Sequence, residues 1–204
     1  IAKIPKDIDA LLVVLGGSDA VNFLTQYEQA GGTKPIVGGS ITVDQTVLNY
    51  KGKRRESLVG TASAGPMADS LDTAEWKKFV ADYKANFKDG FPSPSLFAYL
   101  YYINTKAALD ALDAVKGDLS GGQKKYREAL QKTKFVGPAG EVVIDANRNG
   151  VGTTYITEVT KAPDGSLFNK VVKSVPNITQ TLGLPEADFK KMGLGTRDIP
   201  DCRK

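Results

Sequence analysis

The stretch LLVVLGGSDAVNFLTQYEQAGG, residues 11–32, decides the fold class. Apolar residues run without interruption from Leu11 to Leu15, as in a strand that is buried on both faces. The turn GGSD follows, and apolar residues at helical spacing then continue to Gly31. We expect Ser18 or Asp19 to cap this helix. The pattern predicts a strand, a tight turn and a helix, which is the repeating unit of a parallel α/β sheet.

The rest of the chain extends this α/β pattern and then changes character. A second strand over 35–37 enters the turn GGSIT and a short helix over 42–48, and a third strand is expected over 58–62. Further helices are predicted over 74–87, 95–114, 123–132 and 185–192, and β-rich segments over 142–144, 153–159 and 167–175. The carboxyl-terminal part is therefore richer in strands than the amino-terminal part.

Composition excludes several classes of function. The 204 residues include no histidine and a single cysteine, Cys202, so the commonest general base is absent and zinc sites built from several Cys and His ligands are excluded. The net charge of +4 is scattered rather than gathered into a stripe, so no nucleic-acid partner is expected. No dinucleotide or P-loop fingerprint follows the first strand, which disfavours a Rossmann-like enzyme of small-molecule metabolism. We predict neither catalytic residues, nor metal, nor cofactor.

Small and hydroxyl-bearing residues follow each of the three predicted parallel strands. Open α/β sheets bind ligands at the carboxyl ends of their strands, where such residues leave room and can donate and accept hydrogen bonds. The aromatic residue at the start of the helix predicted over 95–114 offers a ring for stacking. The predicted ligand-binding residues are Gly17, Ser18, Asp19, Gly39, Ser40, Ile41, Ser63, Ala64 and Phe97. Each turn taken alone is equally consistent with a plain loop, and Asp19 with a helix cap.

The order of several segments resembles the carboxyl-terminal half of a type I periplasmic binding protein. These segments are LLVVLGGSDAV, PIVGGS, LVGTASAGPM, EWKKFVADYKANF, PSPSLFAYLYYINTKAALDAL and FVGPAGEVVIDANRNGVG. The resemblance is to the leucine/isoleucine/valine-binding branch of the solute receptors of ABC transporters. It implies two Rossmann-like α/β lobes, with parallel sheets flanked by helices, that are incomplete in this chain. Residues 1–57 and 156–204 would form the second lobe, and residues 58–155 part of the first.

The same resemblance implies a periplasmic receptor that closes around a small ligand and presents it to an ABC permease. The missing amino-terminal half of the protein is then expected as a further partner, supplying the leading strands of both lobes. A sensory ligand-binding domain of the same fold remains an alternative.

One departure from the family pattern bears on the ligand. In amino-acid-binding members an acidic residue after the second strand pairs with the ligand ammonium, and Ser40 stands at that position here. A buried ammonium without a carboxylate is strongly disfavoured, although Asp19 is a possible substitute. We therefore expect an aromatic or aliphatic carboxylic acid, with an aromatic acid favoured and a branched-chain amino acid as the alternative.

Overall fold

A computed structural model describes residues 1–50 and 53–195 of the chain. Its strands are β1 (Leu11–Val13), β2 (Ile36–Gly39), β3 (Ala62–Gly65), β4 (Lys134–Gly137), β5 (Gly140–Ile144), β6 (Gly150–Lys161) and β7 (Leu167–Ile178). Its helices are α1 (Gly17–Gln29), α2 (Gln45–Leu48), the 3-10 helix η1 (Lys53–Leu58), α3 (Ala74–Asn86), α4 (Leu96–Ala114), α5 (Ser120–Gln131) and α6 (Glu186–Lys191). The predicted α/β fold class is confirmed, and Cys202 lies outside the described residues.

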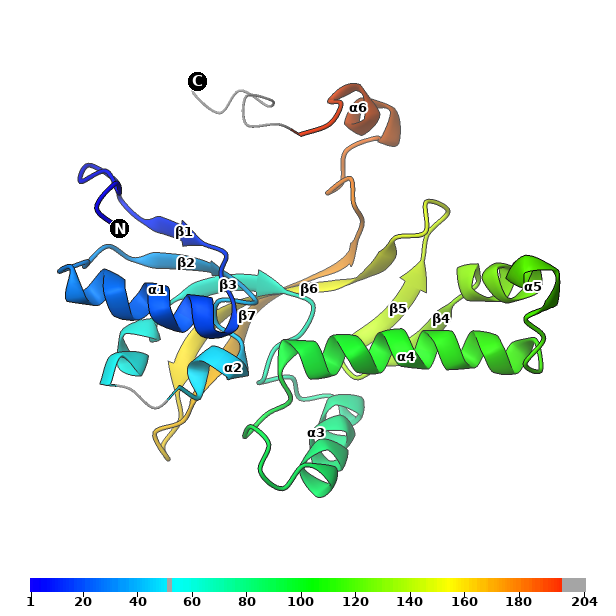
Figure 1. The fold of residues 1–204 in the computed structure, drawn as a ribbon, viewed down its shortest axis with the longest axis horizontal. Coiled ribbons are helices and arrows are strands. Elements are labelled where there is room, and N and C mark those ends of the chain that lie inside the picture. Colours follow the sequence, from blue (N-terminus) through cyan, green and yellow to red (C-terminus); the bar gives the residue numbers. More distant parts are fainter. Residues whose placement is uncertain (51–52, 196–204) are drawn as a thin grey trace.

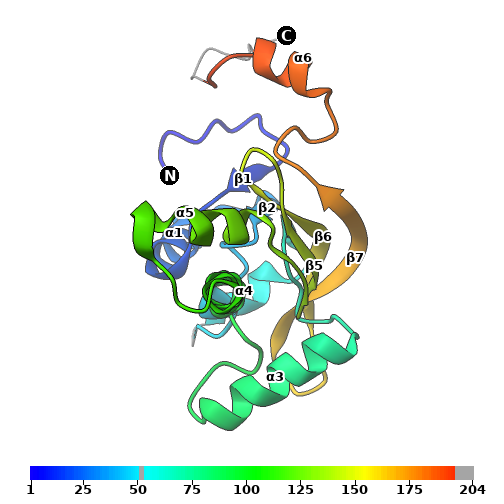
Figure 2. The ribbon, with the colours of Figure 1, turned by 90° about the vertical axis from the view of Figure 1, so that its right-hand side faces the viewer.

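The strands form a mixed sheet in the order β1-β2-β3-β6-β5-β4, with β7 paired to β6. Among the strands of the described residues, β1, β2 and β3 run parallel to one another, and the other pairings are antiparallel. The long strand β6 joins the two ends of the molecule, because its first residues pair with β5 and its later residues pair with β3 (Figure 1). Figure 2 shows α1, α4 and α5 on the same side of the strands. Parallel order is thus confined to the β1–β3 end.

Two hydrophobic clusters hold the molecule together. The first surrounds α1, α2 and the β6–β7 hairpin and consists of Ala20, Val43, Val47, Leu48, Leu58, Val159 and Leu167. The second lies between α3, α4 and the start of β6 and consists of Met67, Ala68, Trp76, Leu96, Tyr99, Ala139 and Tyr155. The two clusters involve different residues and different helices, so each end of the molecule has its own core. Burial of these apolar side chains is the main contribution to the stability of each end.

The third strand does not lie where the sequence predicted it. Residues 58–62 were expected as a strand, but Leu58 ends η1 with its side chain in the first cluster. Gly60 then takes a φ of +88°, in the left-handed region that strands do not use, and β3 begins only at Ala62. The prediction followed an apolar run and could not detect the change of backbone direction at this glycine.

The first lobe boundary was also predicted wrongly. Residues 58–155 were expected to belong to a different lobe from β1 and β2, yet β3 pairs with β2 in parallel, with Val37 opposite Ala62. A boundary in this part of the chain therefore falls after Gly65. The return to the sheet of β3 is made by β6, whose pairing with β3 begins at Tyr155. The division into two lobes itself stays a prediction.

In the described part of the chain, no helix combines the length and apolar character needed to cross a membrane.

Candidate functional site

The carboxyl ends of β1, β2 and β3 meet at one edge of the sheet. The strands are parallel neighbours, with Val13 opposite Gly38 and Gly39 opposite Ala64. The turns that follow the first two strands therefore lie side by side. Thr42 fixes this arrangement, because its Oγ1 donates to the carbonyl of Val13 at 2.8 Å and accepts from the amide of Leu15 at 3.2 Å. The structure thus brings the turns that carry Ser18 and Ser40 to one place.

Glycines allow these turns to approach one another closely. A methyl group at Gly16 would lie 2.3 Å from Cγ1 of Ile41, and one at Gly65 would lie 2.3 Å from Cβ of Ser40. Real side chains do not come this close, so each position requires glycine or a shift of its neighbour. The close packing at Gly65 places the Ser40 turn directly against the end of β3.

We predict that Gly65→Ala destabilises the chain by about 1–3 kcal/mol, because the new methyl group overlaps Ser40 and forces the turn to move. Gly150→Ala is the matched control, since a methyl there meets no atom within 4 Å. Urea unfolding of both variants measures the difference. Equal stability of the two variants would show that the Ser40 turn can move to accommodate the methyl group without loss of stability.

The first turn of α1 lies at this edge of the sheet. Gly16 is the N-cap residue and makes no side-chain hydrogen bond, and Gly17 takes a φ of +52°. The predicted capping by Ser18 or Asp19 is therefore wrong, because both residues lie inside the first turn and are exposed. The first backbone N–H groups of a helix have no partner within the helix, and here no side chain caps them either. Such a terminus is suited to an anionic group.

The two predicted site residues of β3 face opposite ways. Ser63 is buried, and its Oγ lies 2.8 Å from Oγ1 of Thr157 on β6, within hydrogen-bond distance. Ala64 is exposed, as the alternation of side chains along a strand requires. Both were expected in a turn after the strand, whereas both lie within β3. Ser63 lines the same small cavity as Ser40, and the role of the two residues in one ligand site stays a prediction. Only Ala64 lies at the open surface of the strand end.

Phe97 lies in the first turn of α4, close to the Ser40 turn. Ser95 caps α4 by accepting from the amide of Ala98 at 3.1 Å. The carboxylate of Asp44 accepts from the amides of Thr46 and Leu96, and so links the starts of α2 and α4. Leu96 and Ser40 line the same small cavity of about 10 Å³. Phe97 itself is 40% exposed and does not line this cavity, so its place in the ligand site stays a prediction.

A buried polar cluster behind the Ser40 turn was not foreseen from the sequence. Oδ2 of Asp69 accepts from Nε2 of Gln45 at 2.8 Å and from the amide of Asn169 at 2.9 Å. Nδ2 of Asn169 donates to the carbonyl of Val43 at 2.7 Å. These residues lie up to 126 positions apart in the sequence, so no local sequence pattern indicated that they would be in contact. They connect the segment after β3 to α2 and β7.

Burial raises the pKa of Asp69 above its ordinary value of 3.8, and the hydrogen bonds that it accepts offset this only in part. An acid whose pKa is higher in the folded state than in the unfolded state stabilises the fold at low pH, where it is protonated. This contribution to the free energy of unfolding is lost as pH rises through the folded-state pKa. We predict that wild type loses free energy of unfolding relative to Asp69→Asn as pH rises from about 3.5 to about 8. Urea unfolding across this range tests it, and parallel curves for the two proteins would contradict it.

Comparison with known proteins identifies the family. A model described as periplasmic binding protein matches residues 4–165. The chain belongs to the periplasmic binding protein family. A search of curated proteins returns no match. In the part of the chain that the structure describes, no group of three or more His, Cys, Asp or Glu residues is placed to hold a metal ion.

Solved structures of this family resemble the chain closely in fold. An ABC-transporter substrate-binding protein from Sphaerobacter thermophilus is 29% identical, with a TM-score of 0.71 over 83% of this chain and 45% of that one. A solute-binding protein from Rhodopseudomonas palustris, in complex with 3,4-dihydroxybenzoic acid, is 26% identical, with a TM-score of 0.72 over 84% and 46%. A leucine-binding protein from Thermotoga maritima, 21% identical with a TM-score of 0.63 over 82% and 45%, shares the fold.

These comparisons confirm the resemblance to type I periplasmic binding proteins. The relatives from Sphaerobacter thermophilus and Rhodopseudomonas palustris are solute-binding proteins of ABC transporters, in agreement with the expectation that this chain is not an enzyme. The chain spans less than half the length of these relatives. A receptor built on it would therefore contain further elements.

Proposed function

We propose that this chain is part of a periplasmic receptor that binds a small aromatic carboxylic acid and delivers it to an ABC permease. The ligand would lie at the shared edge of β1, β2 and β3. There the uncapped start of α1 offers N–H groups to the carboxylate, Ser18 and Ser40 offer hydroxyls, and Phe97 offers a ring. The family membership supports the receptor, and the relative solved with 3,4-dihydroxybenzoic acid supports the class of ligand.

The choice of ligand rests on the hydrogen bonds that the two carboxylates near Ser40 already accept within the protein. Asp44 accepts from two backbone amides, and Asp69 accepts from Gln45 and Asn169. Asp44 and Oδ2 of Asp69 are thus engaged in holding the fold together. Among the described residues, Oδ1 of Asp69 is buried without a hydrogen-bond partner, and burial raises the pKa of this acid, which favours its neutral form over an ion pair. An ammonium group buried beside Ser40 would lack a partner, which costs several kcal/mol. A ligand without an ammonium group avoids this cost.

A branched-chain amino acid is the second candidate, favoured by one observation. Asp19 is exposed in the first turn of α1, where it does not serve as the cap. Its carboxylate would have to turn toward the ligand to pair with an ammonium group. The same carboxylate would repel the ligand carboxylate at the start of α1, so we rank this candidate lower.

Closure of the receptor would take place around the segments that connect the two hydrophobic clusters. The chain leaves β3 after Gly65 and returns along β6, so a hinge would involve these two connections. We place residues 1–65 and those from 155 onward in one lobe and residues 66–154 in the other. Hinge closure of this kind buries the ligand and creates the form that a permease recognises.

The test is calorimetry on the product of the complete reading frame that contains this chain. The titrants are 3,4-dihydroxybenzoate, 4-hydroxybenzoate and benzoate, compared with leucine, isoleucine and valine. We expect binding of at least one aromatic acid and weaker binding of the amino acids. Tight binding of leucine without response to the aromatic acids would overturn the proposal in favour of the second candidate.

We predict that Phe97→Ala weakens binding of the aromatic acid by roughly 2- to 12-fold, corresponding to about 0.5–1.5 kcal/mol for the lost ring contact. Phe97→Leu is the control, because it keeps an apolar side chain of similar size. Calorimetry of both variants separates ring stacking from general packing. A loss of equal size in both variants would count against a stacking role.

A further inference from the structure

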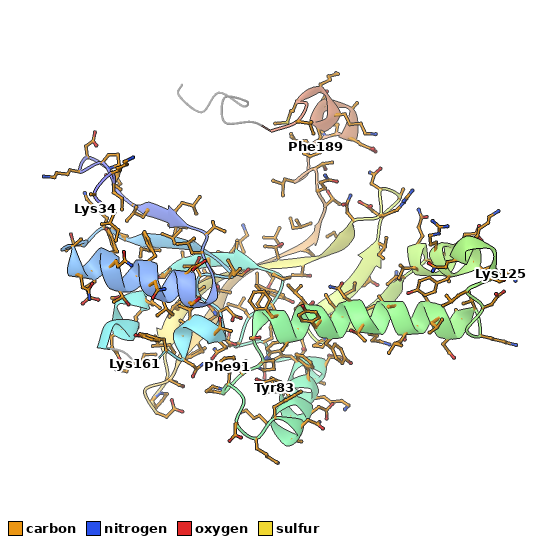
Figure 3. All side chains as sticks on the ribbon, in the orientation of Figure 1. Lys34, Tyr83, Phe91, Lys125, Lys161 and Phe189 are labelled. Atoms are coloured by element: carbon orange, nitrogen blue, oxygen red, sulfur yellow. The ribbon has the colours of Figure 1, made fainter. Side chains whose placement is uncertain are left out.

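The small cavity behind the Ser40 turn has the size and lining of a site for one polar group. Its volume is about 10 Å³, which is about the space that one water molecule requires. The loop between α3 and α4, in which Phe91 is labelled in Figure 3, adds Pro94 to the lining. Besides Ser40, the polar lining residues are Asp44, Gln45, Ser63, Asp69, Thr157 and Asn169.

Two oxygen atoms of this lining have no hydrogen-bond partner among the described residues. They are Oδ1 of Asp69 and Oδ1 of Asn169, and both are buried. Asn169 is only 7% exposed, and its Nδ2 donates to the carbonyl of Val43, which fixes the end of the amide that carries the oxygen. Buried polar atoms are nearly always hydrogen-bonded in native proteins. The two oxygens therefore indicate a partner that comes from outside the described residues.

The hydrogen bonds of Asp69 decide which kind of group fits. Its Oδ2 accepts from Nε2 of Gln45 at 2.8 Å and from the amide of Asn169 at 2.9 Å, so this oxygen carries no proton. Burial raises the pKa of Asp69 and so favours the protonated acid, whose hydrogen must then lie on Oδ1. The cavity thus presents one donor, from Asp69, and one acceptor, from Asn169.

A hydroxyl group matches this pair of atoms, because it can donate to Oδ1 of Asn169 and accept from the protonated Oδ1 of Asp69. An ammonium group only donates, and it would meet the proton of Asp69. A carboxylate only accepts, and it would leave the oxygen of Asn169 unpaired.

A ligand group can reach the cavity from the side of Ser40. Ser40 and Asp69 are the half-buried members of the lining, and the other lining residues are buried. Because Oδ1 of Asp69 is itself buried, the opening lies at Ser40, where the aromatic ring of the ligand is placed above.

We propose that the cavity behind Ser40 receives a ring hydroxyl of the ligand, so that the preferred solutes are hydroxylated aromatic acids. This inference rests on the proposed function, in which the ligand carboxylate lies at the start of α1. The hydroxyl replaces one water molecule and is held by Oδ1 of Asn169 and Oδ1 of Asp69. Asn169 then determines specificity, because a ring without the hydroxyl leaves its oxygen to water or unpaired.

The experiment is calorimetry on the product of the complete reading frame. The titrants are benzoate, 3-hydroxybenzoate, 4-hydroxybenzoate and the two corresponding methoxybenzoates. We expect at least one hydroxy acid to bind at least about tenfold more tightly than benzoate. Its methoxy counterpart should bind no more tightly than benzoate, because it has no hydrogen to donate and exceeds a cavity of about 10 Å³.

Two variants assign the preference to the cavity. Asn169→Leu removes Oδ1 and keeps a side chain of similar size, and it should bring the ratio of the hydroxy acid to benzoate close to one. Met67→Leu, an apolar exchange of similar volume in the same lining, is the control and should keep the wild-type ratio. The ratio is compared within each protein, so a general loss of stability does not imitate the effect.

Other outcomes overturn the inference. Equal affinity of the wild type for benzoate and both hydroxy acids would do so while leaving the proposed receptor for aromatic acids intact. Binding of leucine without response to any aromatic acid would overturn the proposed function as well. A ratio that Asn169→Leu leaves unchanged would place recognition of the hydroxyl elsewhere. The comparison of ligands on the wild type needs no variant, so it decides the question where Asn169→Leu does not fold.

Discussion

Replacing Trp76 with alanine is expected to lower the free energy of unfolding by about 3–5 kcal/mol. The side chain is 2% exposed in the second hydrophobic cluster, and its ring packs against Phe79 at 5.8 Å and Tyr99 at 6.5 Å between centroids. Its Nε1 also donates to the carbonyl of Asp69 at 3.2 Å. Truncation leaves a cavity and an unpaired carbonyl near the connection between β3 and α3.

The measurement is urea unfolding followed by circular dichroism, because Trp76 is the single tryptophan of the chain. Lys77→Ala, next to it on α3 and on the solvent side, should change stability by no more than about 0.5 kcal/mol. Hydrogen exchange then tells which part of the chain is affected. A loss spread equally over β1–β3 would contradict the existence of two separate cores.

Replacing Ser40 with glutamate is expected to weaken binding of the aromatic acid by about a hundredfold in the complete receptor. Ser40 lies in the turn beside the start of α1, where we place the ligand carboxylate. Two like charges about 5 Å apart at an effective dielectric constant of about 20 repel by about 3 kcal/mol. The same change should strengthen binding of leucine, because it supplies the carboxylate that an ammonium group requires.

Ser40→Gln is the matched control for this charge, since glutamine has nearly the same size as glutamate. We expect it to weaken binding of the aromatic acid far less. Calorimetry with both variants against 3,4-dihydroxybenzoate and leucine gives the comparison. Equal losses in the two variants would assign the effect to space near Gly65 and would contradict the electrostatic role of Ser40.

Periodic apolar patterns in the sequence placed most of the elements correctly. The continuous run from Leu11 and the spacing through Tyr27 identified β1 and α1, and the aromatic segment identified α4. The prediction of β3 over residues 58–62 was wrong because an apolar run does not show where the backbone turns at Gly60. The short strand β4 was not predicted, because its pairing with β5 depends on a hairpin rather than on its own composition.

The sequence by itself determined the α/β class, the family and the turns after the first two strands, because these follow from local spacing and from the order of segments. The tertiary structure decided which residues of those turns meet. It brought Ser40 against Gly65, turned Ser63 toward Thr157, and gathered Asp69, Gln45 and Asn169 into one buried cluster. Such contacts join residues far apart in the chain, and they depend on strand register and side-chain direction, which local patterns do not encode.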